Sequence, residues 1–168
     1  MKKGLLLIAL VVFLTISIND AYAQRVVKKF NQSIAANPIG LAFGLFNATY
    51  EQALSPENSF TVGAIYWGYG GWTAFGLSGS YRWYLFQDSD KMIKGLSFGP
   101  LVSLGMWSYE NTTFDNSTSL SVGGEIAYKW IFDNFVVEPN AQISFNVLSI
   151  DGLTYRPFGI GVNLGYAW

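Results

Sequence analysis

The 168-residue sequence predicts an all-β fold, a single antiparallel barrel with its large apolar side chains outside, on three observations. Apolar side chains alternate with other side chains along most of the chain, which is typical of β-strands with two different faces. The alternate positions hold mostly Gly, Ser, Ala and Asn, which are small enough to crowd a narrow barrel interior. After residue 23 no apolar run approaches the roughly 20 residues of a spanning helix, which excludes an α-helical membrane bundle.

The first 23 residues have the layout of a cleaved export signal. Two lysines precede an apolar run at 5–18, and Ala21-Tyr22-Ala23 supplies the small-x-small pattern of a signal-peptidase site. An anchoring helix is the alternative, but the run is shorter than the roughly 20 residues that cross a bilayer. The sequence therefore predicts a signal peptide at 1–23, export through the Sec pathway, a periplasmic N-terminal tail at 24–32 and a barrel at 33–168.

The last strand shows the alternation most clearly. Phe158, Ile160, Val162 and Leu164 share one face, with Gly and Asn between them. The same pattern predicts eight strands, at 33–43, 47–54, between the turns at 55–58 and 69–71, at 73–86, 96–108, 119–132, 135–147 and 158–168. Pro38 lies in the first of these strands, where it is tolerated only at an edge, a bulge or a lipid-facing irregularity.

The composition of the second face decides between two all-β architectures. In a soluble sandwich or calycin-like barrel, the apolar face points inward and polar side chains meet water. Here the second face is small rather than charged, whereas large aliphatic and aromatic side chains suit lipid. The pattern favours an eight-stranded antiparallel up-and-down transmembrane β-barrel, and a soluble secreted calycin-like binder is the alternative.

An even strand number places both chain ends on one side, the periplasmic side of an exported barrel. The turns at 55–58, 87–94 and 133–134 are then periplasmic, and those near 44–45 and at 69–71, 110–118 and 149–156 face outward. Eight aromatic side chains fall on apolar faces near the periplasmic rim, where an interfacial girdle is expected. They are Tyr50, Tyr81, Trp83, Tyr128, Trp130, Phe135, Tyr166 and Trp168.

Five charged residues occupy the small face and are predicted to point into the lumen: Glu51, Arg82, Glu125, Lys129 and Glu138. Charges in a low-dielectric interior must be paired or hydrated. We therefore expect these side chains to meet across the narrow lumen in an ion-pair network that fills the barrel. Glu125 and Lys129 also lie four residues apart on one face of their strand. A polar constriction or a proton-coupled site is the functional alternative.

The composition also excludes several kinds of chemistry. The sequence contains no Cys and no His, so it offers no thiol nucleophile, no His-based catalytic pair and no imidazole or thiolate metal ligand. Its formal net charge of −1 argues against nucleic-acid binding. We expect no enzyme activity, no metal site and no cofactor.

The C-terminal residues resemble the assembly signal of outer-membrane barrels, with Asn163 and Gly165 followed by the aromatic residues Tyr166 and Trp168. From about residue 37 the chain is similar to small eight-stranded outer-membrane proteins of the OmpA/OmpX type, in an uncharacterised branch known as a domain of unknown function. The stretches NPIG at 37–40, TYE at 49–51, YRWY at 81–84 and GGEIAYKW at 123–130 carry this similarity. The resemblance implies that the barrel-assembly machinery recognises the last strand by edge pairing.

The predicted function is that of an integral outer-membrane protein with a structural, surface-interaction or envelope-stress role. An eight-stranded barrel is just wide enough for side chains to fill, which argues against a general pore. The alternative within the membrane is a narrow channel or carrier for small apolar or amphipathic molecules, which would enter through lateral gaps near Gly or Pro38. The expected partners are outer-membrane lipid and the assembly machinery, the protein is expected to be a monomer, and no ligand is assigned.

Overall fold

The computed structural model describes residues 30–85, 93–109, 117–148 and 158–168. Its elements are, in chain order, β1 (Gln32–Ala36), α2 (Pro38–Leu41), β2 (Leu45–Ser55), β3 (Asn58–Tyr69), β4 (Trp72–Leu85), β5 (Gly95–Tyr109), β6 (Ser117–Phe132), β7 (Phe135–Leu148) and β8 (Phe158–Ala167). In these ranges no helix is both long and apolar enough to cross a membrane.

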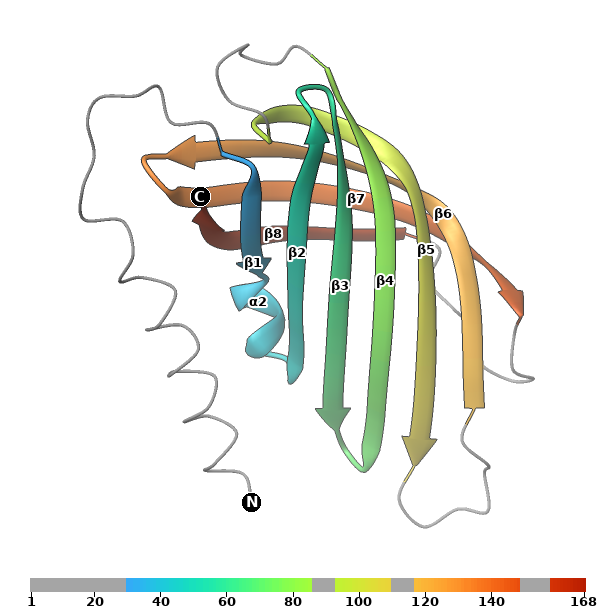
Figure 1. Ribbon diagram of the computed structural model, residues 1–168. Helices are drawn as coiled ribbons and strands as arrows, with labels where there is room; N and C mark the ends of the chain where they lie inside the picture. Colours follow the sequence, from blue (N-terminus) through green and yellow to red (C-terminus); the bar gives the residue numbers. More distant parts are fainter. Residues whose placement is uncertain (1–29, 86–92, 110–116, 149–157) are drawn as a thin grey trace.

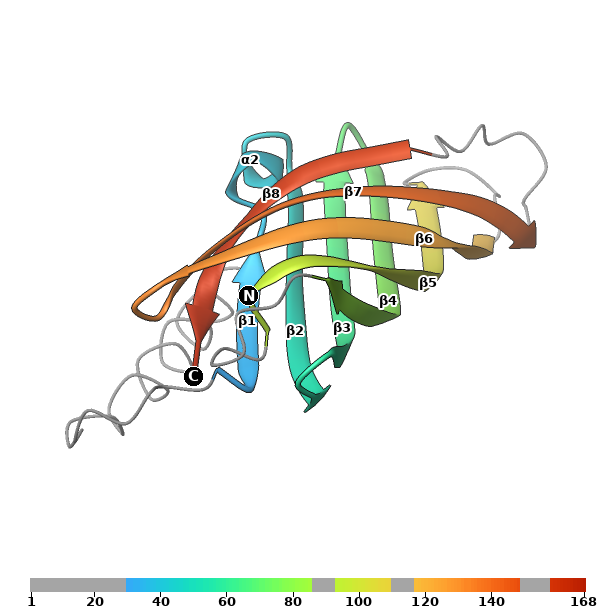
Figure 2. The ribbon, with the colours of Figure 1, turned by 90° about the horizontal axis from the view of Figure 1, so that it is seen from above.

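The strands form a closed antiparallel barrel in which each strand pairs with the next and β8 pairs with β1 (Figure 1). This is the up-and-down topology, and it confirms the predicted fold class. In both views β6, β7 and β8 run at a steep angle to β2, β3 and β4 (Figures 1 and 2). The two groups of strands therefore form walls that face each other across the lumen.

Side chains alternate between the two faces of the wall, as the sequence pattern predicts. On β6, Glu125 and Lys129 point inward, whereas Ile126, Tyr128 and Trp130 are exposed on the outside. Large apolar side chains are exposed on every strand from β2 to β8. Because successive side chains of a strand point to opposite faces, this inside-out distribution follows from the sequence position alone.

The first strand is shorter than predicted. The strand expected at 33–43 ends at Ala36, residues 38–41 form α2, and β2 begins at Leu45. The side-chain oxygen of Asn37 caps the helix by accepting hydrogen bonds from two backbone N–H groups of the first turn, at 3.0 and 3.2 Å. Pro38 occupies the first helical position, where its missing N–H is not needed. Asn-Pro therefore starts a helix here, and the longer strand was wrong.

Two hairpins and both described chain ends define one end of the barrel, called here the terminal end. It contains the β2–β3 and β6–β7 turns, and the backbone N–H of Asn31 donates to the carbonyl of Trp168 at 2.9 Å. The opposite end, called the loop end, contains α2 and the β3–β4 hairpin. The predicted turns at 55–58, 69–71 and 133–134 are hairpins, and Asp133, Gly70 and Gly71 have positive φ. The connections at 110–118 and 149–156 lie mostly or wholly outside the described residues.

An apolar plug closes the lumen at the terminal end. It consists of Phe30, Tyr84, Ile93, Ile131, Val136 and Ala167. Phe30 belongs to the predicted tail and Ile93 to the predicted polar connection at 87–94, yet both side chains are buried inside the barrel. Burial removes these two apolar side chains from water, which explains why the chain turns inward at both places.

Candidate functional site

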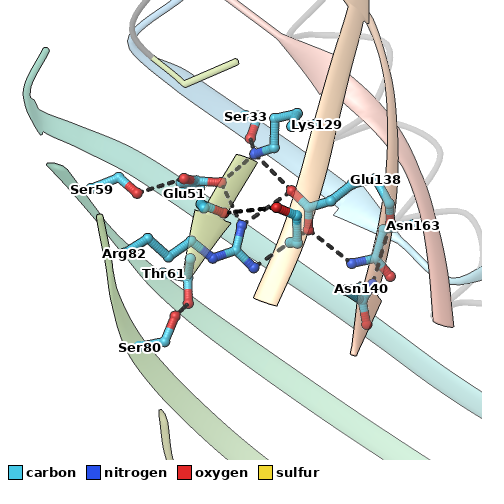
Figure 3. Close-up of polar contacts among 12 residues, drawn as sticks. Ser33, Glu51, Ser59, Thr61, Ser80, Arg82, Lys129, Glu138, Asn140 and Asn163 are labelled. Atoms are coloured by element: carbon cyan, nitrogen blue, oxygen red, sulfur yellow. Dashed lines mark hydrogen bonds and ion pairs between the residues drawn. The ribbon is translucent and has the colours of Figure 1, made fainter. Parts of the chain in front are cut away.

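Five charged side chains from four strands meet in the lumen next to the plug and form one connected ion-pair network (Figure 3). They are Glu51 on β2, Arg82 on β4, Glu125 and Lys129 on β6, and Glu138 on β7. Each occupies an inward position, so strand periodicity and barrel closure together bring them to one place. The network contains three carboxylates and two cations, and its formal net charge is −1.

Arg82 is the centre of this network. Its Nε donates to Glu125 Oε1 at 2.7 Å, and its Nη1 donates to Glu51 at 3.0 Å and to Glu138 at 3.1 Å. Its Nη2 donates to Glu125 and Glu138, both at 3.4 Å. A guanidinium carries five N–H groups, so these five contacts use its full donor capacity.

Lys129 links the opposite walls of the barrel. Its Nζ forms ion pairs with Glu51 and with Glu138, the latter at 3.0 Å, and donates to Ser33 Oγ at 3.0 Å. Asn163 on β8 donates to the other oxygen of Glu138 at 3.3 Å. Glu125 and Lys129 lie four residues apart on one face of β6, and both side chains form ion pairs across the lumen, as the sequence predicts.

Hydroxyl groups complete the coordination of the carboxylates. Ser59 and Tyr84 each donate to Glu51 Oε1 at 2.5 Å, and Ser80 donates to Glu125 Oε1 at 2.5 Å. Within the described residues no buried side-chain nitrogen or oxygen lacks a hydrogen-bond partner. Because the carboxylates are surrounded by donors, the arrangement supports a structural role for the charges.

The sequence reasoning missed several members of this polar layer. Ser33, Ser59, Thr61, Ser80 and Tyr84 were not singled out, although each lies on the same inward face as the charged residue of its own or a neighbouring strand. Their position in the alternation was the available signal. The alternation does not tell which hydroxyl group donates to which carboxylate. That depends on the register of the strands and on which inward side chains meet across the lumen.

The lumen is hollow between the network and the loop end. A cavity of about 270 Å³ lies there, with Thr61, Arg82 and Glu125 among its lining residues on the network side. Amide and hydroxyl side chains dominate its wall, among them Asn47, Thr49, Ser78, Asn140, Gln142 and Asn163. Glycines at inward positions of β3 and β8 leave the space open.

The eight aromatic residues expected to form a girdle lie near the terminal end, seven of them on strands and Trp168 just after β8. Trp83, Tyr128, Trp130 and Phe135 are exposed, and the other four are half-buried. Neighbours on one face pack against each other, with ring centroids 5.2 Å apart for Tyr81 and Trp83 and 4.7 Å apart for Tyr128 and Trp130. These rings form the outer surface at that end of the barrel.

The four residues of the C-terminal motif occupy different surroundings on and just after β8. Asn163 points inward to Glu138, and the rings of Tyr166 and Trp168 stack with centroids 6.2 Å apart. Gly165 lies so close to β1 that an added Cβ would stand 2.1 Å from the Ile34 carbonyl oxygen. A side chain at this position is therefore incompatible with the observed β1–β8 pairing.

The fold and the distribution of side chains define a class of protein, the transmembrane type of β-barrel, which is apolar outside and polar inside. Among the part of the chain that the structure describes, no group of three or more Asp or Glu residues could hold a metal ion.

No family model matches the sequence, and no curated protein is significantly similar to it. The predicted branch of unknown function therefore stays a prediction.

Comparison with solved structures shows which barrels have this fold. The chain is similar to the Yersinia pestis outer membrane protein Ail, solved in a phospholipid bilayer nanodisc, with 12% identity, a TM-score of 0.54 and coverage of 83% of this chain and 100% of Ail. It is also similar to the N-terminal β-barrel domain of Pseudomonas aeruginosa OprF, with 13% identity, a TM-score of 0.50 and coverage of 83% and 98%. The chain thus has the fold of small eight-stranded outer-membrane barrels.

Proposed function

We propose that this chain is an integral outer-membrane protein with a non-enzymatic structural or surface-interaction role. The observation that carries the proposal is the inside-out distribution of side chains. Lys129, Glu51 and Glu138 are among the largest fully buried side chains, whereas large apolar side chains cover the outside. Water would disfavour this exterior, and a bilayer favours it, which speaks against the soluble calycin-like alternative.

The aromatic residues and the chain ends give the proposed orientation. Rings at the terminal end suit the interface between hydrocarbon and headgroups, so this end faces the periplasm and the loop end faces outward. The predicted signal peptide at 1–23 supplies the route across the inner membrane. The barrel is a monomer whose partners are outer-membrane lipid and, during biogenesis, the assembly machinery.

The lumen is closed at the terminal end, so the proposed protein is not a general diffusion pore. Two successive layers fill it there, the apolar plug and the ion-pair network. An ion crossing the barrel would have to displace both layers, including charges that are paired across the lumen. The same side chains that form ion pairs between the opposite walls therefore also block the lumen.

Fractionation of cells that express the full chain, combined with gels of unboiled samples and planar-bilayer recordings, tests this proposal. We expect the protein in the outer-membrane fraction, a shift in gel mobility on boiling and no stable conductance steps. A well-folded sample that stays in the soluble fraction would contradict the membrane location. Stable conductance steps would instead favour the narrow channel.

The proposed assembly signal is tested by a pair of matched variants, Trp168→Ala and Trp130→Ala. Both remove an aromatic ring from the same end of the barrel, but only Trp168 ends the predicted signal. We expect Trp168→Ala to lower the outer-membrane yield in cells several-fold, while both variants fold equally well into pure lipid vesicles. Equal yields in cells would contradict a signal at Trp168.

The cavity of about 270 Å³ favours a second candidate function, a carrier for small amphipathic molecules. It is large for an interior that side chains otherwise fill, and its polar wall makes hydrogen bonds available. This function requires a route into the cavity.

A further inference from the structure

The cavity is walled at its sides, including the place where β1 ends. There α2 packs against both neighbouring strands. A Cβ added to Gly40 would stand 2.8 Å from the Leu45 side chain on β2, and the side-chain nitrogen of Asn37 would stand 2.9 Å from a Cβ added to Gly161 on β8. The plug and the ion-pair network close the lumen at the terminal end. The loop end is therefore the remaining side of the cavity.

The inner wall of the barrel becomes accessible towards the loop end. On β5 the inward residues Ser97 and Leu101 are buried, whereas Ser103 and Trp107, which lie further towards the loop end, are half-exposed. Trp67 on β3 is half-exposed as well, and its ring centroid lies 6.2 Å from that of Trp107. Water and small solutes thus reach the inner wall from the loop end.

The cavity wall contains hydrogen-bonding groups that the protein itself does not use. Within the described residues, the half-buried side chains of Thr49, Ser78 and Gln142 have no hydrogen-bond partner. Asn47 uses its side-chain oxygen, which accepts from the Asn37 backbone N–H at 2.8 Å, and its NH₂ group stays available. Because hydroxyls and amides both donate and accept, the cavity offers both kinds of group to a ligand.

These groups lie on two facing walls, each of which has a glycine among them. On the β2–β4 wall, a Cβ added to Gly63 would stand 3.4 Å from Thr49 Oγ1 and 2.5 Å from Ser78 Oγ. On the β7–β8 wall, a Cβ added to Gly159 would stand 3.1 Å from the Gln142 side chain. The glycines leave the space between the walls open, so the cavity has hydroxyl groups on one side and an amide on the other.

The charged residues among the described cavity lining are already paired. They are Arg82 and Glu125, whose Nε and Oε1 atoms are 2.7 Å apart. All five N–H groups of Arg82 contact carboxylates, so none is left for an anion. Glu125 accepts from Arg82 and from Ser80, so a cation would compete with donors that are in place. A charged ligand would therefore enter without a free counter-charge, which is costly in an interior.

The size of the cavity limits the ligand. Its volume of about 270 Å³ is below the roughly 300–1,000 Å³ of pockets for drug-sized ligands. A single hydroxylated ring fits this range better than a larger molecule does. Neutral, polar and small are thus the three properties that the cavity selects.

We propose that the cavity binds a small uncharged molecule rich in hydroxyl groups, of about the size of a monosaccharide, which enters from the loop end. Its hydroxyl groups bond with Thr49 and Ser78 on one wall and with Gln142 on the other. Because the terminal end is closed, the ligand is bound and released on the same side. The proposal goes beyond the proposed function, since it depends on the interior of the barrel and not on the membrane around it.

Binding is tested with the barrel in phospholipid nanodiscs, by following the side-chain amide signals of Asn47 and Gln142 by NMR. D-Glucose should shift these signals saturably and give contacts to its ring protons. Glucuronate and charged glucosamine, which add a negative or a positive charge to the same ring, should need at least a tenfold higher concentration. Cyclohexanol, which has a ring with one hydroxyl group, should do so as well.

A matched pair of variants tests the site. Thr49→Val removes a hydroxyl group from the cavity wall, and Thr118→Val makes the same change on the exposed outer face of β6. We expect Thr49→Val to weaken glucose binding about fivefold, the loss expected for one hydrogen bond, and Thr118→Val to leave it unchanged. Gln142→Leu should weaken binding at least as much as Thr49→Val. Gly159→Leu, which places a side chain in the cavity, should abolish it.

The route is tested with single cysteines, since the sequence contains none. Ser103→Cys and Ser97→Cys place the same thiol at two inward positions of β5, one half-exposed and one buried. A water-soluble methanethiosulfonate reagent should modify the cysteine at position 103 at least tenfold faster than the one at position 97. The reverse order would place the opening at the terminal end and contradict the proposed route.

Three binding results would also overturn the proposal. They are the absence of a saturable glucose shift, which would mean that the cavity holds water only, equal binding of a charged sugar or of cyclohexanol, and equal effects of the two threonine variants. Any of these results in a barrel that fractionates with the outer membrane would refute this proposal and leave the proposed function intact. Absence from the outer membrane, with glucose binding as expected, would refute the proposed function alone.

Discussion

The two halves of the lumen are built differently although strands β2 to β8 enclose both. At the terminal end, a cluster of buried apolar side chains and a five-residue ion network occupy the interior. Towards the loop end, the inward positions hold Gly, Ser and amides, and a cavity remains. The strands are held together by backbone pairing in both halves, so filling is not required for a closed barrel. The difference indicates that the terminal half provides stability and closure, and that the loop half is available for binding.

Arg82→Met is expected to have the largest effect, because it leaves three buried carboxylates with one cation. Removing one partner of a buried ion pair typically costs about 3–5 kcal/mol. We expect a loss of this size in the free energy of unfolding, measured by urea titration in lipid vesicles. A loss below about 1 kcal/mol would show that the terminal half is not the stabilising half.

Leu164→Arg changes the outer face at the boundary between the halves, where the β1–β8 ladder ends. An arginine on the lipid face near the bilayer midplane costs about 2–4 kcal/mol. The same vesicle titration measures the effect. Unchanged folding into lipid would show that the assigned lipid face is wrong.

Glu138→Gln is expected to cost less than Arg82→Met, because it leaves two carboxylates and two cations. It removes the charge from contacts with Arg82, Lys129 and Asn163, and hydrogen bonds to charged groups are worth about 1.5–3 kcal/mol. Glu125→Gln is the control, since Glu125 pairs with one cation and is more exposed at 11%. We expect the smaller loss for Glu125→Gln, and the reverse order would contradict a larger contribution from the carboxylate that pairs with both cations.

Gln142→Leu is expected to have the smallest effect on stability, within about 0.5 kcal/mol, because its side chain lines a cavity rather than a packed layer. Urea titration beside the Glu138→Gln variant gives the comparison directly. A loss as large as that of Glu138→Gln would mean that both halves of the lumen contribute equally to folding, and the distinction between them would fail.

The alternation of side chains was sufficient to predict the strand number, the barrel and the inward direction of Glu51, Arg82, Glu125, Lys129 and Glu138. The alternation was sufficient because successive side chains of any single strand point to opposite faces, whatever its neighbours are. The same local reasoning failed at Asn37-Pro38, where a helix cap competes with strand extension. Asn followed by Pro is itself a signal for a helix start, which the alternation of side chains does not detect.

The partners of the inward charges depend on the tertiary structure. Strand register and closure decide that Lys129 reaches Glu51 and Glu138 rather than pairing along β6 with Glu125. They also bring Phe30 and Ile93 from segments that look polar into one apolar plug.

The sequence by itself thus determined which side chains face outward and which face the lumen, since that is a property of neighbours in the chain. Only the tertiary structure decided which inward residues meet, where the lumen is closed and where it stays hollow. The physical reason is that these outcomes depend on contacts between strands that are distant in sequence.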